Sequence, residues 1–169
     1  MAPSDDDNVV ALPLPARNSG PSAELLGTLR RVAGALDDLG DGFERIQPSV
    51  QWSIARWHAT SIPFRMRLVP VYQHLTELRK VDPAEWPDIA WAIDLMSARA
   101  GFEERLQMIV NLLDMLLSGG MPVDERAWQV QRFTTGGKEF LAALGRLRSV
   151  VAARHPEIWR PQRPYIRSS

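Results

Sequence analysis

This chain contains no cysteine, only two lysines and no long uncharged apolar run. The lack of cysteine excludes disulfide bonds and thiolate metal sites. No apolar stretch approaches the ~18 residues that a membrane-spanning helix needs. The start, MAPSDDDNVVALPLP, is acidic and proline-containing, without the basic onset and apolar centre of a signal peptide. We therefore expect a cytoplasmic protein without membrane contact.

The sequence also has little that would support catalysis. Its three histidines, His58, His74 and His155, are isolated from one another. Neither the Glu-x-x-His pair of di-iron bundles nor the His-Glu-x-x-His motif of zinc proteases is present. We predict that the protein is not an enzyme and that it has no catalytic residue, metal site or cofactor.

One acidic pattern resembles a known catalytic motif. Asp37, Asp38 and Asp41 form a DDxxD sequence, which is similar to the magnesium–diphosphate motif of the all-helical prenyl and terpene synthases. The resemblance implies a magnesium-dependent diphosphate enzyme, because carboxylates one turn apart can share a hard cation. No second aspartate-rich element follows, and Gly40 inside the motif and Gly42 after it indicate a helix end. A solvated acidic helix end is the simpler interpretation, and the enzyme is a remote alternative.

Apolar residues recur at heptad-like spacing through most of the chain, which predicts an all-α fold. The 169 residues are 45 % apolar and 24 % charged, enough for one domain with a sizeable core. We predict a four- to five-helix bundle over residues 21–155, between a disordered acidic tail (1–20) and an extended basic, aromatic tail (156–169).

The predicted core faces follow from that spacing. They are, in chain order, Leu25, Leu29, Val32, Leu36, Leu39, Phe43 and Ile46; Val50, Ile54, Trp57 and Ser61; Phe64, Leu68, Val71, Leu75 and Leu78; Trp86, Ile89, Ile93, Met96 and Ala100; Leu106, Ile109, Val110, Leu113, Leu116 and Leu117; and Val130, Phe133, Gly137, Phe140, Leu144, Leu147 and Val151.

Proline and glycine set the predicted helix boundaries. Helices are expected to begin at five places, namely Pro21-Ser22, Pro48, after Ile62-Pro63, Asp82-Pro83 and Pro122. Pro70 should kink the third helix because it lacks a backbone donor. The run Thr134-Thr135-Gly136-Gly137 predicts a hinge or break in the last helix.

The charges are sorted by segment although their sum is zero. Residues 1–44 carry 3 arginines and 8 acids, and residues 82–125 carry 2 arginines and 9 acids. Residues 45–81 carry 6 basic residues and one acid, and residues 126–169 carry 9 basic residues and two acids. The two basic blocks would form a phosphate-binding stripe if they shared one side of the bundle. If adjacent blocks pack together instead, their charges cancel.

The basic blocks hold the candidate contact residues for nucleic acid or for an acidic protein partner. Aromatic residues beside arginines suit base stacking and suit docking into a protein groove equally well. The candidates are Arg56, Arg65, Arg67, Arg132, Lys138, Arg146, Arg148, Arg154, Trp159, Arg160, Arg163, Tyr165 and Arg167.

Two hypotheses about function remain. Six tryptophans, several of them off the core faces, favour a non-catalytic helical subunit of a larger assembly that acts through protein–protein contacts. The alternative is a subunit that contacts nucleic-acid backbone through blocks 45–81 and 126–169. At the level of class alone it is similar to the small helical subunits of RNA-guided (CRISPR) effector complexes, which have no active site.

Overall fold

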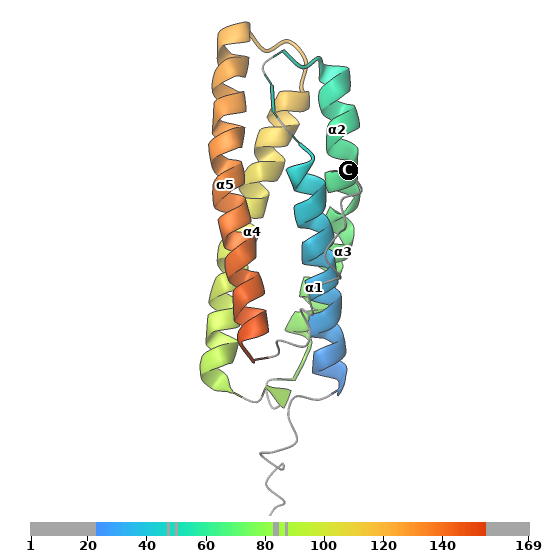
Figure 1. Ribbon diagram of the computed structural model, residues 1–169, viewed down its shortest axis with the longest axis vertical. Coiled ribbons are helices and arrows are strands. Elements are labelled where there is room, and N and C mark those ends of the chain that lie inside the picture. The colour runs from blue at the N-terminus through green and yellow to red at the C-terminus, as the bar shows by residue number, and fades with distance from the viewer. Residues whose placement is uncertain (1–22, 47, 50, 83–84, 87, 155–169) are drawn as a thin grey trace, which may run out of the picture.

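The computed structural model describes residues 23–46, 48–49, 51–82, 85–86 and 88–154. It contains five helices, α1 (Ala23–Glu44), α2 (Ile54–Met66), α3 (Leu68–Arg79), α4 (Ile89–Leu117) and α5 (Val123–Arg154). Helices α2 and α3 follow each other as one bent rod, so the chain forms four rods that alternate in direction (Figure 1). The predicted all-α bundle is confirmed, while the predicted tails lie outside the described residues.

The order of the rods around the bundle decides which surfaces can act together. Helix α1 packs against α2 and α3 on one side and against α5 on the other. Helix α4 packs against α5 and against α2. The α2–α3 rod and α5 therefore occupy opposite corners of the bundle, as do α1 and α4 (Figure 1).

The core seams of α1 and α5 are confirmed along their whole length. All seven predicted positions of α1 are buried, and so are all seven of α5. At the centre, the Phe43 ring lies 5.5 Å from Phe64, 5.7 Å from Phe133 and 4.9 Å from Phe140, centroid to centroid. These edge-to-face and tilted contacts join three of the four rods.

Two predicted helix starts are wrong because a side-chain cap decides the boundary. Helix α2 begins at Ile54 rather than at Pro48, since the Ser53 hydroxyl accepts a hydrogen bond from the Arg56 amide. Helix α4 begins at Ile89 rather than at Asp82-Pro83. There the Asp88 carboxylate accepts bonds from the amides of Ala90 and Trp91.

We predicted a helix boundary at Ile62-Pro63 and a kink at Pro70. Neither is found at those residues, and the break between the two helices lies at Arg67 instead. Helix α2 continues through Pro63 to Met66, and α3 begins immediately afterwards at Leu68. Pro70 thus falls in the first turn of α3, where the amide that proline lacks would have no partner in the helix anyway. The chain therefore accommodates Pro70 by ending α2 and beginning α3, and not by a kink within one continuous helix.

The glycine pair of the last helix is a packing feature and not a hinge. Helix α5 is continuous from Val123 to Arg154. A Cβ atom on Gly137 would lie 2.8 Å from Cζ of Phe43, and one on Gly136 would lie 3.0 Å from Cε of Met108. These glycines let α5 approach α1 and α4 more closely than an alanine would.

We predict that Gly137→Ala destabilises the protein by about 1–3 kcal/mol, because the Phe43 ring is held by three other rings and cannot move aside. Urea unfolding followed by circular dichroism measures the change. Gly145→Ala on the same helix is the matched control. No atom lies within 4 Å of its Cβ, so it should stabilise the helix by up to ~1 kcal/mol. Equal effects of the two substitutions would contradict the packing role.

Candidate interaction surface

The first half of α4 exposes an apolar stripe that we predicted to lie in the core. Ile89 is 78 % exposed, Ile93 60 % and Met96 64 %. They follow one another at intervals of four and three residues, so they share one side of the helix. The prediction was wrong because this half of α4 has two apolar sides, and only one of them faces the bundle.

The buried side of the same segment carries larger side chains and one specific hydrogen bond. Trp91, Leu95, Ala98 and Phe102 are buried. The Trp91 indole Nε1 donates to the backbone carbonyl of Val150 on α5 at 2.8 Å. Tryptophan buries the most surface and needs a partner for its N–H, so this bond fixes which side of α4 packs inward.

The exposed stripe ends abruptly along the helix. Beyond Ala100 the same outward side continues with Glu104, Gln107 and Asn111, all exposed. Gln107 and Asn111 hydrogen-bond to each other at 2.9 Å. The second half of α4 is thus an ordinary solvated surface, and the apolar character is confined to about three turns.

A hollow of about 370 Å³ lies beside this stripe. Leu78, Val81, Trp86 and Leu95 are among the residues that line it. It exists because the lower part of the bent rod, α3, packs on α1 and diverges from the first half of α4. Together the stripe and the hollow form what we call the α4 surface, namely Leu78, Arg79, Val81, Trp86, Ile89, Ala92, Ile93, Leu95, Met96 and Arg99.

A second apolar patch crosses the break between α2 and α3. Ile62 is 49 % exposed, Met66 72 % and Val69 68 %. The patch sits on the outer side of the bent rod, next to exposed Arg65. No pattern in the sequence distinguished either exposed patch from the core faces, because only the tertiary arrangement decides which apolar side is covered.

The basic candidates of the first block do not form a cluster. The Arg56 guanidinium stacks over the Trp52 ring at 5.0 Å, and Arg65 is exposed. Arg67 is enclosed instead, since its Nη1 is buried against α1 and would lie 2.8 Å from a Cβ on Gly42. Arg56 and Arg65 remain accessible for contacts, whereas Arg67 belongs to the junction of α1, α2 and α3.

The basic candidates of the second block spread around α5. The Arg132 guanidinium stacks over Trp128 at 4.8 Å, while Lys138 and Arg146 are exposed. Arg148 forms an ion pair with Asp37 of α1 at 3.4 Å. Helix α5 ends at Arg154. The remaining candidates lie outside the described residues, namely Trp159, Arg160, Arg163, Tyr165 and Arg167.

The two basic blocks face opposite sides, because the α2–α3 rod and α5 are diagonal in the bundle. Each seam between neighbouring rods is instead crossed by an ion pair. The pairs are Arg31–Glu77 (3.4 Å), Arg79–Glu103 (3.4 Å), Arg105–Glu139 (3.0 Å) and Arg148–Asp37 (3.4 Å). Each pair has at least one side chain that is more than 40 % exposed, so each stabilises the bundle by only ~0–1 kcal/mol.

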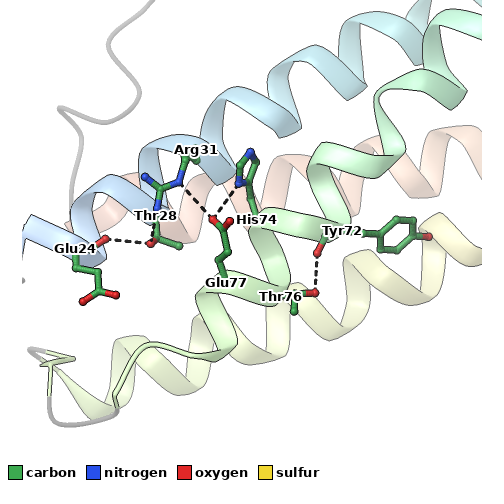
Figure 2. A network of polar contacts seen from close by, with 7 residues as sticks. All are labelled: Glu24, Thr28, Arg31, Tyr72, His74, Thr76 and Glu77. Atoms are coloured by element: carbon green, nitrogen blue, oxygen red, sulfur yellow. Dashed lines mark hydrogen bonds and ion pairs between the residues drawn. The ribbon is translucent and has the colours of Figure 1, made fainter.

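The most connected polar group is at the seam of α1 and α3 (Figure 2). The Glu77 carboxylate lies 3.1 Å from the His74 Nδ1 and 3.4 Å from the Arg31 Nε. Arg31 also donates to the Thr28 hydroxyl at 3.1 Å. The hydrogen bond with His74, followed by the nearby charges, lowers the pKa of Glu77 below its usual 4.5. This network joins α1 to α3.

In the acidic motif of α1, Asp38 and Asp41 are exposed, whereas Asp37 is half-buried and pairs with Arg148. Burial raises the pKa of Asp37, although Arg148 opposes the shift. In the described part of the chain, no three histidine, aspartate or glutamate side chains come close enough together to hold a metal ion. Within that same part, no helix is both long and apolar enough to cross a bilayer.

No protein-family model matches the chain, and comparison with curated protein sequences and with solved structures finds no significant match.

We predict that Glu77→Gln lowers the stability at neutral pH and that this loss shrinks as the pH falls below about 4.5. A carboxyl with a lowered folded pKa contributes stability above its unfolded pKa and loses that contribution on protonation. Chemical unfolding between pH 3.5 and 7 measures the effect. Thr76→Ser, next to it and without a titrating group, is the control. A loss that stays constant over this range would contradict the prediction.

Proposed function

We propose that this protein is a non-catalytic helical subunit of a larger assembly and that it acts through protein–protein contacts. The observation that carries the proposal is the α4 surface, where three large apolar side chains stand in solvent on an otherwise well-packed helix. Contiguous exposed apolar surface beside a hollow is the usual mark of a protein-binding site.

The free energy of burying apolar side chains favours a binding partner over a chance occurrence of these residues on the surface. Burying one Ile or Met side chain contributes about 1.5–3 kcal/mol. Ile89, Ile93 and Met96 gain less than half of this in the free protein, since each is more than half exposed. The outward residues of the second half of α4 show that polar side chains suit this side of the helix. An apolar residue at all three positions is best explained by a surface that is covered in the assembly.

The nucleic-acid alternative has weaker support from the arrangement of the rods. A backbone-contacting stripe needs basic residues along one side, and the two basic blocks occupy opposite corners of the bundle. Two arginine–tryptophan stacks, Arg56 on Trp52 and Arg132 on Trp128, are the features that favour it. The purification experiment below also tests this nucleic-acid alternative.

We predict that Ile93→Glu abolishes binding of a stoichiometric protein partner and leaves the fold intact. A charge at the centre of the α4 surface would have to be desolvated on binding, whereas an exposed helical position tolerates glutamate. Purification of the tagged protein from its native host, with nuclease treatment and a salt series, measures the partner.

Val123→Glu is the matched control, because Val123 is 74 % exposed and lies at the start of α5, at the other end of the bundle. The control variant should keep the partner. Co-purified nucleic acid that is lost steeply with salt, without a stoichiometric protein, would contradict the proposal and support the nucleic-acid alternative.

A further inference from the structure

The outer face of the α2–α3 rod carries a second apolar stripe, which we call the outer seam. It consists of Ala55, Ala59, Ile62, Met66 and Val69. We propose that the outer seam binds an amphipathic helix of a partner protein, and that this helix carries acidic residues on both flanks of its own apolar stripe. The outer seam shares no residue with the α4 surface, so the inference does not depend on what covers α4.

The spacing of the outer seam fits a helical partner. Its five residues follow one another at intervals of four, three, four and three positions, and all five are exposed. Arg67, at the break between the two helices, keeps right-handed helical backbone angles (φ −88°, ψ −6°), so the stripe continues from α2 into α3. This is the spacing of a coiled-coil seam, in which the apolar residues of one helix insert between those of another.

The sizes of the side chains along the seam also suit a helix. Ala55 and Ala59 are small, and small residues let a second helix approach to the ~8–10 Å typical of packed pairs. Ile62, Met66 and Val69 then offer large side chains that are 49 %, 72 % and 68 % exposed. The seam thus has a region of close approach followed by a region of large apolar contact.

The charge beside the seam selects the kind of partner. None of residues 45–76 is acidic. In the heptad register, Arg56 lies on one flank of the seam and Arg65 on the other. Each side of the bundle is made of two rods and is mixed in charge, whereas the flanks of the outer seam carry only positive charge.

No carboxylate of this protein neutralises these flanks. Within the described residues neither Arg65 nor Arg67 forms an ion pair, and the buried Arg67 Nη1 has no hydrogen-bond partner. Two carboxylates beside the rod are already paired, Glu77 with Arg31 and Glu103 with Arg79. A partner with acidic flanks would supply the missing opposite charge.

The same charges disfavour two other occupants. A second copy that paired through its own outer seam would set Arg56 and Arg65 against arginines. Nucleic acid would find positive charge here, but its phosphates would leave Ile62, Met66 and Val69 without an apolar contact. A helix with an apolar stripe and acidic flanks satisfies both features of the surface.

The experiment measures the binding of synthetic peptides to the full chain by fluorescence anisotropy. The probe is a helix of about three heptads with leucine at the seam positions and glutamate at the flanking positions. One matched peptide has lysine at the flanks, and another has the composition of the probe in scrambled order. We expect the glutamate probe to bind at least about tenfold more tightly than either matched peptide. Equal binding of all three, or no binding of the probe at ~100 μM, overturns the inference.

Two substitutions at exposed positions locate the binding site. Met66→Glu places a carboxylate within the seam and should weaken binding of the glutamate probe by about tenfold or more. Arg65→Glu reverses the charge of one flank and should shift the preference towards the lysine peptide. A gain of lysine-peptide binding cannot come from damage to the fold. Ile93→Glu, which alters the α4 surface, is the control and should bind the probe as the wild type does.

The outcomes separate this inference from the proposed role of α4. If Ile93→Glu loses the probe and Met66→Glu keeps it, the probe occupies the α4 surface and the outer seam is not the site. If Met66→Glu loses the probe while Ile93→Glu still purifies with its stoichiometric partner, the outer seam stands and the role of α4 fails. An oligonucleotide that binds the wild type and Met66→Glu equally, but not Arg65→Glu, assigns the surface to nucleic acid and overturns the inference.

Discussion

The whole bundle depends on how closely the rods approach around the Phe43 ring. Phe43 of α1 contacts Phe64 of α2 and two phenylalanines of α5, and Phe102 of α4 reaches the same cluster through Phe140 at 5.8 Å. Such close ring contacts are possible because Gly137 faces Phe43 without a side chain. The aromatic cluster thereby joins all four rods at one level along the bundle axis. The rods can diverge from one another only at levels on either side of this cluster.

The divergence that bears on function is that of the α2–α3 rod from its neighbours. At the break around Arg67 the chain turns, so that α2 packs on both α1 and α4, whereas α3 packs mainly on α1. The ion pairs Arg31–Glu77 and Arg79–Glu103 still tie α3 to both neighbours. Backbone separation between α3 and the first half of α4 leaves the hollow open. The divergence of α3 begins at this break, where Pro70 lies in the first turn of the new helix.

The sequence predicted the fold class and two of the core seams, because α1 and α5 each have a single apolar side and periodicity identifies it. It failed on the first half of α4, where Ile89, Ile93 and Met96 compete with Trp91, Leu95 and Phe102 for the core. Both sets recur at helical spacing, so periodicity cannot rank them. The tertiary hydrogen bond from Trp91 to Val150 decides the outcome, and a residue 59 positions away is invisible to a local pattern. The functional surface escaped prediction for the same reason that the core was misassigned.

The sorted charges find their explanation in the order of the rods. Up-down connectivity places each block beside the two blocks of opposite sign, so the acidic α1 and α4 occupy one diagonal and the basic α2–α3 and α5 the other. This arrangement of charges favours the observed order of rods over a bundle in which two rods have exchanged places. Each exposed ion pair nevertheless contributes little free energy of stabilisation. It also leaves every side of the molecule mixed in charge. An association surface on such a protein must then draw its affinity from apolar contact, which is what the first half of α4 and the patch around Met66 provide.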